Sequence, residues 1–212
     1  MKTDETSGME SRIIEAAKRV FVRKGYEATT MGDIAAEVGI SRTAMHYYFR
    51  TKEMMFESIF AQLIDAVLPD INLIMDEPTT IREKLPKIVD RYLNALRSNH
   101  LFPLFVINEM NRDMEHLLHS VAKGPNRIQV LMRFKQQVVD EMEKGWIRPQ
   151  PLEDLVSTFI SLIVFPILIR NVLITLFMDG KPEAFDDYLN RRRQLICNTM
   201  YHLMEPLTVN NE

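Results

Sequence analysis

Cysteine, glycine and long apolar runs are scarce in this chain. Only Cys197 among the 212 residues is a cysteine, and a lone thiol forms neither an intrachain disulfide nor a paired-cysteine metal motif. The longest uncharged apolar stretch, Leu155 to Ile169, contains Pro166 and is shorter than the roughly 20 residues that span a bilayer. The first ten residues lack the apolar run of a signal peptide. We therefore predict a cytoplasmic protein that does not span a membrane.

The composition indicates a folded protein with an uneven distribution of charge. Hydrophobic residues make up 46% of the chain and charged residues 26%, and the net charge of −3 argues against a general polyanion binder. Residues 11–60, however, hold eight Lys or Arg against six Asp or Glu, whereas residues 61–212 hold seventeen against twenty. A mildly basic segment on an acidic body directs that segment towards a polyanion.

Apolar residues recur at helical spacing throughout the chain, and no stretch alternates polar with apolar residues for long. Glycines and capping residues such as Thr30, Ser41 and Thr80 divide this pattern into segments. We therefore predict an all-α fold of about nine helices without repeats. The expected helices cover roughly residues 14–25, 30–39, 41–49, 51–67, 81–96, 103–121, 128–142, 152–178 and 185–203.

Residues 31–53, MGDIAAEVGISRTAMHYYFRTKE, follow the pattern of a helix-turn-helix. Ala35 is small where the second helix crosses the first, and Gly39 occupies the turn, where a positive φ favours glycine. The apolar positions that close the two helices on the first helix are Ile34, Val38, Ile40 and Met45. These features in this order predict a DNA-binding head; three packed helices without a DNA role are the alternative.

The second helix of this motif carries side chains suited to contact DNA. Counting from Ser41, the outward-facing residues are Arg42, Thr43, Ala44, His46 and Tyr47. Arginine reads guanine with two hydrogen bonds, threonine and alanine contact the thymine methyl, and tyrosine and histidine suit phosphates on the groove walls. Lys52 adds positive charge at the start of the next helix. The DNA-contacting residues that we predict are Thr30, Ser41, Arg42, Thr43, His46, Tyr47, Tyr48 and Lys52.

The first quarter of the chain resembles the DNA-binding head of the TetR family of bacterial transcriptional regulators. The resemblance lies in the segments FVRKGYEATT, DIAAEVGIS, HYYF and TKE, and the length and helical layout agree with it. The chain departs from the family pattern at Thr43, where glycine is usual, and at His46, where tyrosine is usual. The second departure either removes the phosphate contact expected there or makes it sensitive to pH.

The resemblance implies a regulator in two parts, a DNA-binding domain of residues 1–50 and a ligand-binding and dimerisation domain of residues 51–212. It implies a homodimer on a palindromic DNA operator, with recognition helices roughly 34–36 Å apart. It also implies a repressor that a small-molecule effector releases from DNA, with the helix that begins at Thr51 as the lever. No cofactor is implied.

The family usually forms its effector pocket among the middle helices. The candidates for its lining are Phe60, Leu63, Tyr92, Phe105, Asn108, Met132, Phe159 and Ile163; each has an ordinary core position as the alternative. The 14 methionines favour adaptable apolar packing and hence a hydrophobic effector. The helix expected over residues 152–178 is apolar on most sides, which indicates burial by a partner. With the last helix it forms the expected four-helix dimer interface, which includes Leu155, Phe159, Leu189, Ile196 and Met200.

Other polar clusters leave alternatives open. Arg170 and Asn171 fall in the middle of the expected apolar helix, where they pair across the interface, reach into the pocket or mark an exposed kink after Pro166. His116 and His119 have the spacing of a metal pair, but we favour a solvated helix face and predict no metal site. An all-helical enzyme lacks convergent acids, bases or a nucleophile in this sequence. A helical DNA-binding or interaction protein without ligand control is the other alternative.

Overall fold

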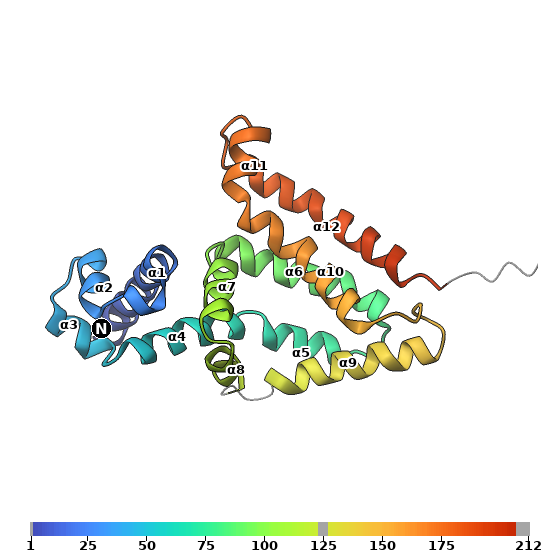
Figure 1. Ribbon diagram of the computed structural model, residues 1–212, viewed down its shortest axis with the longest axis horizontal. Helices are drawn as coiled ribbons and strands as arrows, with labels where there is room; N and C mark the ends of the chain where they lie inside the picture. Colours follow the sequence, from blue (N-terminus) through green and yellow to red (C-terminus); the bar gives the residue numbers. More distant parts are fainter. Residues whose placement is uncertain (1, 123–126, 207–212) are drawn as a thin grey trace, which may run out of the picture. The chain divides into compact units, whose positions relative to one another are not determined.

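The computed structural model describes residues 2–122 and 127–206 and shows α-helices joined by short connections (Figure 1). No strand occurs within these ranges, so the predicted all-α class is confirmed. Twelve helices are formed there instead of the expected nine. The difference arises because residues 68–76 form a helix that we did not expect, and because two expected helices are each broken in two.

The chain forms two compact units. The head unit comprises residues 1–66 and 101–125, and the body unit comprises residues 67–100 and 126–212. The head unit contains α1 (Lys2–Ala28), α2 (Met31–Val38), α3 (Arg42–Tyr48), α4 (Lys52–Asp65), α7 (Phe102–Arg112) and α8 (Met114–Ala122). The body unit contains α5 (Leu68–Asp76), α6 (Ile81–Ser98), α9 (Arg127–Glu143), α10 (Leu152–Leu168), α11 (Arg170–Phe177) and α12 (Ala184–Met204). The functional division at residue 50 stays a prediction.

Local capping chemistry sets the ends of the short helices in the head unit. The Thr30 hydroxyl accepts a hydrogen bond from the Asp33 N–H, and the Asp33 carboxylate accepts one from the Thr30 N–H, which completes the predicted capping box. Gly39 ends α2 in the left-handed conformation, at φ 79° and ψ 34°. The Ser41 hydroxyl then caps α3 at the Ala44 N–H. These caps fix the sharp turn between α2 and α3.

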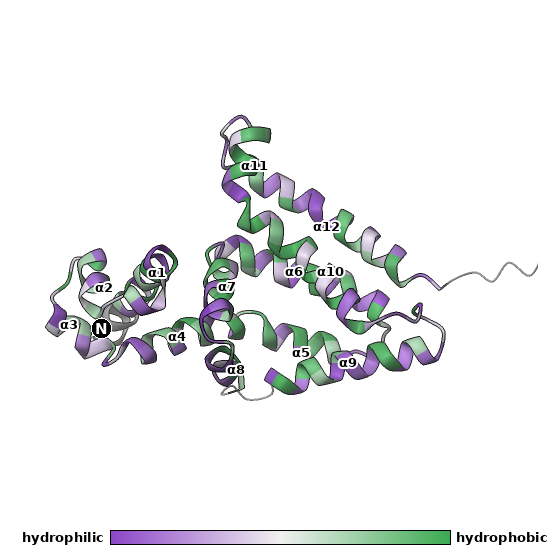
Figure 2. Ribbon diagram, viewed as in Figure 1, coloured by the Kyte–Doolittle hydropathy of each residue, from purple (hydrophilic) through white to green (hydrophobic). Residues whose placement is uncertain are grey.

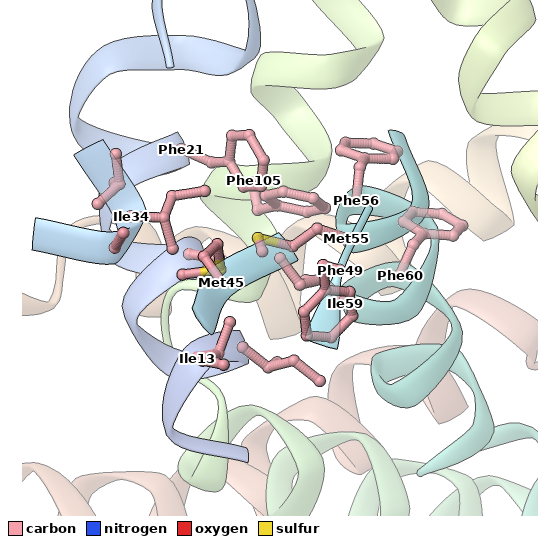
Figure 3. Close-up of a cluster of buried hydrophobic side chains, with 14 of the residues drawn as sticks. Ile13, Phe21, Ile34, Met45, Phe49, Met55, Phe56, Ile59, Phe60 and Phe105 are labelled. Carbon is pink, nitrogen blue, oxygen red and sulfur yellow. The ribbon is translucent and has the colours of Figure 1, made fainter. Parts of the chain in front are cut away.

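A cluster of aromatic and aliphatic side chains forms the core of the head unit (Figure 3). The Phe56 ring of α4 lies at its centre, with its centroid 6.3 Å from that of Phe21 in α1 and 4.9 Å from that of Phe105 in α7. The completely buried Met45 brings α3 into the same cluster. The first, third and fourth helices are therefore tied to α7 by one continuous apolar core.

The body unit is built around α6, which contacts α5, α9, α10 and α12. One buried carboxylate helps to start this helix: both oxygens of Glu141 in α9 accept from the Ile81 N–H, at 3.0 and 3.2 Å. The buried Lys84 ammonium donates to the Met75 carbonyl at 3.0 Å and to the Gln137 side chain at 2.8 Å. Each of these buried charged groups is hydrogen-bonded, as the low polarity of the interior requires.

The prediction of a single helix over residues 152–178 is wrong, because the chain bends by 63° between α10 and α11. Pro166 lacks the N–H that would continue the helix, and Ile169 leaves helical geometry at φ −94° and ψ 16°. Of the alternatives for Arg170 and Asn171, the kink after Pro166 is therefore present. Arg170 begins α11, and its guanidinium lies 5.2 Å from the centre of the Phe185 ring. Both helices are predominantly apolar (Figure 2). In the described part of the chain, no single straight helix is long and apolar enough to span a membrane.

Two further breaks explain the remaining extra helices. Pro69 does not end a helix, because it occupies the first turn of α5, where a missing N–H has no consequence. Asp113 leaves helical geometry at φ −157° and separates α7 from α8. Its carboxylate accepts from the His116 N–H at 2.9 Å and so satisfies a donor of the first turn of α8.

Candidate nucleic-acid interface

The outer face of α3 presents polar and aromatic side chains to solvent. Arg42, Thr43 and His46 are exposed, and Tyr47 is exposed to 78%. Met45 and Phe49, which alternate with them along the helix, are buried in the head core. The predicted division of this segment into an exposed side and a buried apolar side is therefore confirmed, except that Ala44 is half-buried. We call the exposed side, formed by Arg42, Thr43, His46 and Tyr47, the reading face; its contact with DNA stays a prediction.

Aromatic and imidazole groups are held at the C-terminal end of this face. The rings of Tyr47 and Tyr48 meet edge to face, with centroids 5.2 Å apart, and Tyr48 is half-buried. The His46 Nδ1 lies 3.3 Å from the Arg50 carbonyl oxygen. That contact fits a tautomer with the proton on Nδ1, which leaves Nε2 as an acceptor in the neutral ring.

Ser41 and Thr30 serve first as helix caps. Their hydroxyl oxygens accept from the Ala44 and Asp33 N–H groups, at 3.1 Å each. Both caps place the first turns of α2 and α3, so these residues position the reading face whether or not they contact a phosphate themselves.

Lys52 has a structural role that the sequence pattern does not reveal. Its ammonium donates to the carbonyl oxygens of Tyr26 and Glu27, at 2.7 and 3.2 Å, and lies 4.3 Å from the centre of the Tyr26 ring. It thereby satisfies carbonyls at the C-terminal end of α1. An ammonium has three N–H donors, so one remains for a phosphate after these two bonds.

Ion pairs between α1 and α2 brace the helix that supports α3. Glu37 pairs with Arg19 and Arg23 at 3.1 Å each, and Asp33 pairs with Lys24 at 2.7 Å. The hydrogen bond from Lys24, together with those from Thr30, lowers the pKa of the Asp33 carboxyl to about 2. These pairs neutralise the acidic side chains of α2 beside the reading face.

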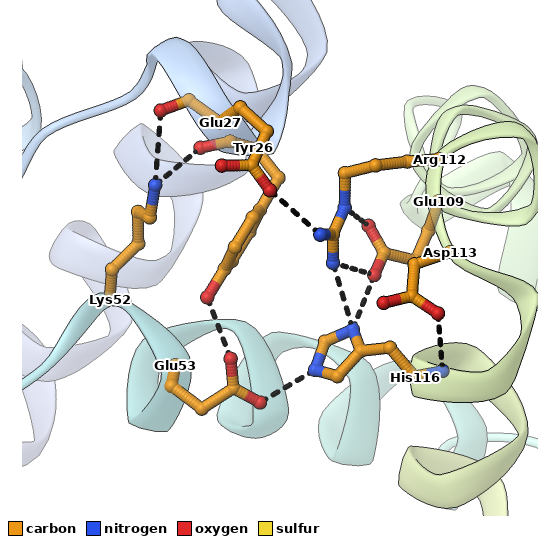
Figure 4. A network of polar contacts seen from close by, with 8 residues as sticks. All are labelled: Tyr26, Glu27, Lys52, Glu53, Glu109, Arg112, Asp113 and His116. Atoms are coloured by element: carbon orange, nitrogen blue, oxygen red, sulfur yellow. Dashed lines mark hydrogen bonds and ion pairs between the residues drawn. The ribbon is translucent and has the colours of Figure 1, made fainter.

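A network of charged side chains joins α1, α4, α7 and α8 in the head unit (Figure 4). Glu53 accepts from the Tyr26 hydroxyl at 2.6 Å, and its other oxygen lies 2.6 Å from His116 Nε2. On the opposite side of the ring, His116 Nδ1 contacts the carboxylate of Glu109. Arg112 binds that same carboxylate and also Glu27 at 2.9 Å. The expectation that His116 belongs to a solvated face is therefore wrong, although His119 is exposed.

The head region matches the model of the bacterial regulatory proteins of the tetR family over residues 13–59. Across 164 residues the chain is 46% identical to YfiR of Bacillus subtilis (strain 168), an uncharacterized HTH-type transcriptional regulator, covering 72% of this chain and 75% of that protein. The chain belongs to the TetR family. It is thus a helix-turn-helix transcriptional regulator and not an enzyme.

Two more distant matches are also named as transcriptional regulators. The transcriptional repressor KstR2 of Mycolicibacterium smegmatis (strain ATCC 700084 / mc(2)155) is 26% identical over 148 residues, 70% of this chain and 72% of that protein. The structure of the ketosteroid transcriptional regulator KstR2 of Mycobacterium tuberculosis has a TM-score of 0.62 and 19% identity, and covers 90% of this chain and 93% of that one. The second similarity concerns the fold alone.

The candidate effector-contacting residues of this TetR-family regulator are divided between the two units. In the head unit, Phe60 and Phe105 are core residues, Asn108 is exposed, and only the backbone of Leu63 is described. In the body unit, the Tyr92 and Phe159 rings meet edge to face at 5.9 Å. Ile163 is buried and Met132 is exposed. An effector site among these residues stays a prediction.

Most of the candidate dimer residues are core residues of the body unit itself. Four of the five are at most 2% exposed within the single chain, namely Leu155, Leu189, Ile196 and Met200; the fifth, Phe159, is half-buried. Side chains so completely covered offer little surface to a partner. The apolar side chains that the same two helices leave exposed are Ile160, Phe165, Leu168 and Leu195. Sequence periodicity indicated the apolar helices but not which side of each faces its own core.

Proposed function

We propose that the protein is a cytoplasmic, ligand-responsive transcriptional repressor that binds a palindromic operator as a homodimer and leaves it when a small hydrophobic effector binds. The observation that carries this proposal is the exposed face of α3, held by the buried Met45 and Phe49 on a complete helix-turn-helix. A helix supported in this way enters the major groove with its side chains directed at base edges.

Each side chain of the reading face has a role that follows from its chemistry. Arg42 reads a guanine through its guanidinium, and the Thr43 methyl contacts a thymine. Tyr47, which is 78% exposed, donates to a phosphate on the groove wall. His46 is exposed on the same face, where its imidazole suits a second phosphate contact.

Selection from a random DNA duplex library tests the proposal directly. The wild-type protein is expected to enrich a palindrome whose half-sites lie about one helical turn apart, at 10–10.5 base pairs, or a multiple of it. Binding to the enriched duplex is then measured by gel shift against a scrambled duplex of the same composition. Failure to enrich any sequence contradicts the proposal.

Lys52→Ala is expected to weaken binding to all DNA sequences alike, because a phosphate contact carries no base information. The slope of log Kd against log salt concentration should fall by about 1. Lys52→Arg, which keeps the positive charge, should retain most of that slope. An unchanged slope in Lys52→Ala would restrict Lys52 to its contacts with the α1 carbonyls.

We infer that the dimer forms through the exposed apolar side chains of α10 and α12. Phe165 in α10 is 57% exposed and Leu195 in α12 is 47% exposed, and the two helices pack side by side in the body unit. An apolar face of this kind is characteristic of a protein–protein interface. A partner's equivalent pair would complete a four-helix bundle.

Phe165→Glu is expected to convert the dimer into a monomer, because it places a charge in the apolar interface. The molar mass in solution, measured by light scattering, should fall by about half. Leu73→Glu on α5 is the matched control, since Leu73 is an apolar residue outside α10 and α12 that is 66% exposed, and this variant should remain dimeric. A monomeric wild type would contradict the dimer itself.

Two observations support a hydrophobic effector. The candidate effector-contacting residues of both units are mainly aromatic or aliphatic. The structurally similar KstR2 of Mycobacterium tuberculosis is described as a ketosteroid transcriptional regulator. Titration of the bound enriched duplex with a series of fatty acids and steroids tests this proposal. Release by none of them, but by a charged metabolite, would contradict it.

A further inference from the structure

His116 lies between two carboxylates that come from different helices. Its Nε2 is 2.6 Å from a Glu53 oxygen in the first turn of α4, and its Nδ1 contacts Glu109 in α7. The ring also packs on Phe56, with centroids 4.9 Å apart. Only an imidazolium has N–H donors on both nitrogens and so hydrogen-bonds to both carboxylates at once.

Several other charged or titratable groups surround this ring. From α7, the Arg112 guanidinium lies 3.0 Å from His116 Nδ1 and is itself paired with Glu109 and Glu27. From α1, the Tyr26 ring lies 6.0 Å away, and between α7 and α8 the Asp113 carboxylate accepts from the backbone N–H of His116. Burial by itself lowers the pKa of His116, but the hydrogen bonds to Glu53 and Glu109 outweigh it and raise the pKa above its ordinary value.

The two carboxylates differ in their access to water, which decides what deprotonation does. The Glu109 side chain is 2% exposed, whereas the Glu53 side chain is 44% exposed. If the neutral ring placed a nitrogen lone pair against Glu109, two hydrogen-bond acceptors would face each other and the buried carboxylate would lose this hydrogen bond, which is costly. The remaining proton therefore stays on Nδ1, facing Glu109. Glu53 then faces the Nε2 lone pair and loses its hydrogen bond to the ring, while its other oxygen still accepts from the Tyr26 hydroxyl.

Glu53 connects this ring to the DNA-binding elements. It directly follows Lys52, whose ammonium holds the end of α1, and its second oxygen accepts from the Tyr26 hydroxyl of α1. Thr51, the cap of α4, stands only two residues after the buried Phe49 that ends α3. A bond that fixes Glu53 therefore fixes the junction of α1, α3 and α4.

We propose that His116 is a positioning residue for DNA binding: its protonated ring clamps Glu53 and orders the junction of α1, α3 and α4, and its deprotonation removes this hydrogen bond and loosens the junction. This inference rests on the proposed function. The ordered junction presents α3 ready to bind, so less conformational freedom is lost when DNA is bound. Because the folded-state pKa is raised, the clamp is complete below the unfolded-state pKa of about 6.5 and is lost as the pH rises through the folded-state value.

The test compares the pH dependence of DNA affinity among three proteins, using the duplex enriched by the wild type. Between about pH 6 and about pH 9, wild-type Kd is expected to rise about five- to tenfold more than that of His116→Gln. His119→Gln removes an exposed imidazole from the same helix and should follow the wild type. His46 is present in all three proteins, so its contribution to DNA binding is common to the comparison.

Glu53→Gln provides a second variant that keeps the shape and hydrogen-bonding capacity of the side chain. It should flatten the pH dependence like His116→Gln, and it should lower the pKa of His116 measured from its ring proton signals by NMR. Equal pH profiles in wild type, His116→Gln and Glu53→Gln, with DNA binding intact, would overturn the inference alone. Absence of DNA binding in every protein at every pH would instead overturn the proposed function on which it rests.

Discussion

Phe56→Ala is expected to reduce the free energy of unfolding by about 3–5 kcal/mol, the largest stability effect that we predict for a single residue. The Phe56 ring is 1% exposed, and its centroid lies within 6.3 Å of those of Phe21, Tyr26 and Phe105. Its removal leaves a cavity that side chains from several helices cannot fill without separating from one another. Urea unfolding followed by circular dichroism, at fixed protein concentration, measures the change.

Met54→Ala provides the matched control on the same helix. Met54 is 48% exposed, so its truncation should change the free energy of unfolding by only about 0.5 kcal/mol or less. Similar losses in the two variants would show that Phe56 is not central to the core of the head unit. Retention of stability in Phe56→Ala would contradict the packing that Figure 3 shows.

Arg42→Ala is expected to lower the preference for the enriched duplex over a scrambled one by about 10–100-fold, the equivalent of about 1–3 kcal/mol. Arg42 is the first residue of α3 and is exposed on the reading face, where a guanidinium forms two hydrogen bonds with a guanine. The measured quantity is the ratio of the two Kd values at one salt concentration, because salt affects specific and non-specific binding differently.

Arg191→Ala is the matched control for Arg42→Ala. Arg191 is an exposed arginine on α12, so its loss removes the same charge from the chain but not from the reading face. The Kd ratio of this variant should equal that of the wild type. A loss of affinity for both duplexes without a change in their ratio would make Arg42 a phosphate contact instead of a base contact.

The sequence predicted best those features that depend on neighbours in the chain. The Thr30 and Thr80 capping boxes form between residues three positions apart, and the left-handed turn at Gly39 depends on one residue. The alternation that buries Met45 and exposes Tyr47 follows from helical periodicity. Such signals are complete within a few residues, so the helix-turn-helix and its reading face were readable before the structure.

The sequence by itself thus determined the all-α class, the caps and the helix-turn-helix with its exposed side. Only the tertiary structure decided that His116 lies between Glu53 and Glu109, 63 and seven residues away in the chain. It also decided that Leu155 and Ile196 face their own core while Phe165 remains exposed. Periodicity gives the apolar side of a helix, but which neighbour covers that side depends on contacts between distant segments. The pKa of a histidine depends on the same contacts, because they set its burial and its partners.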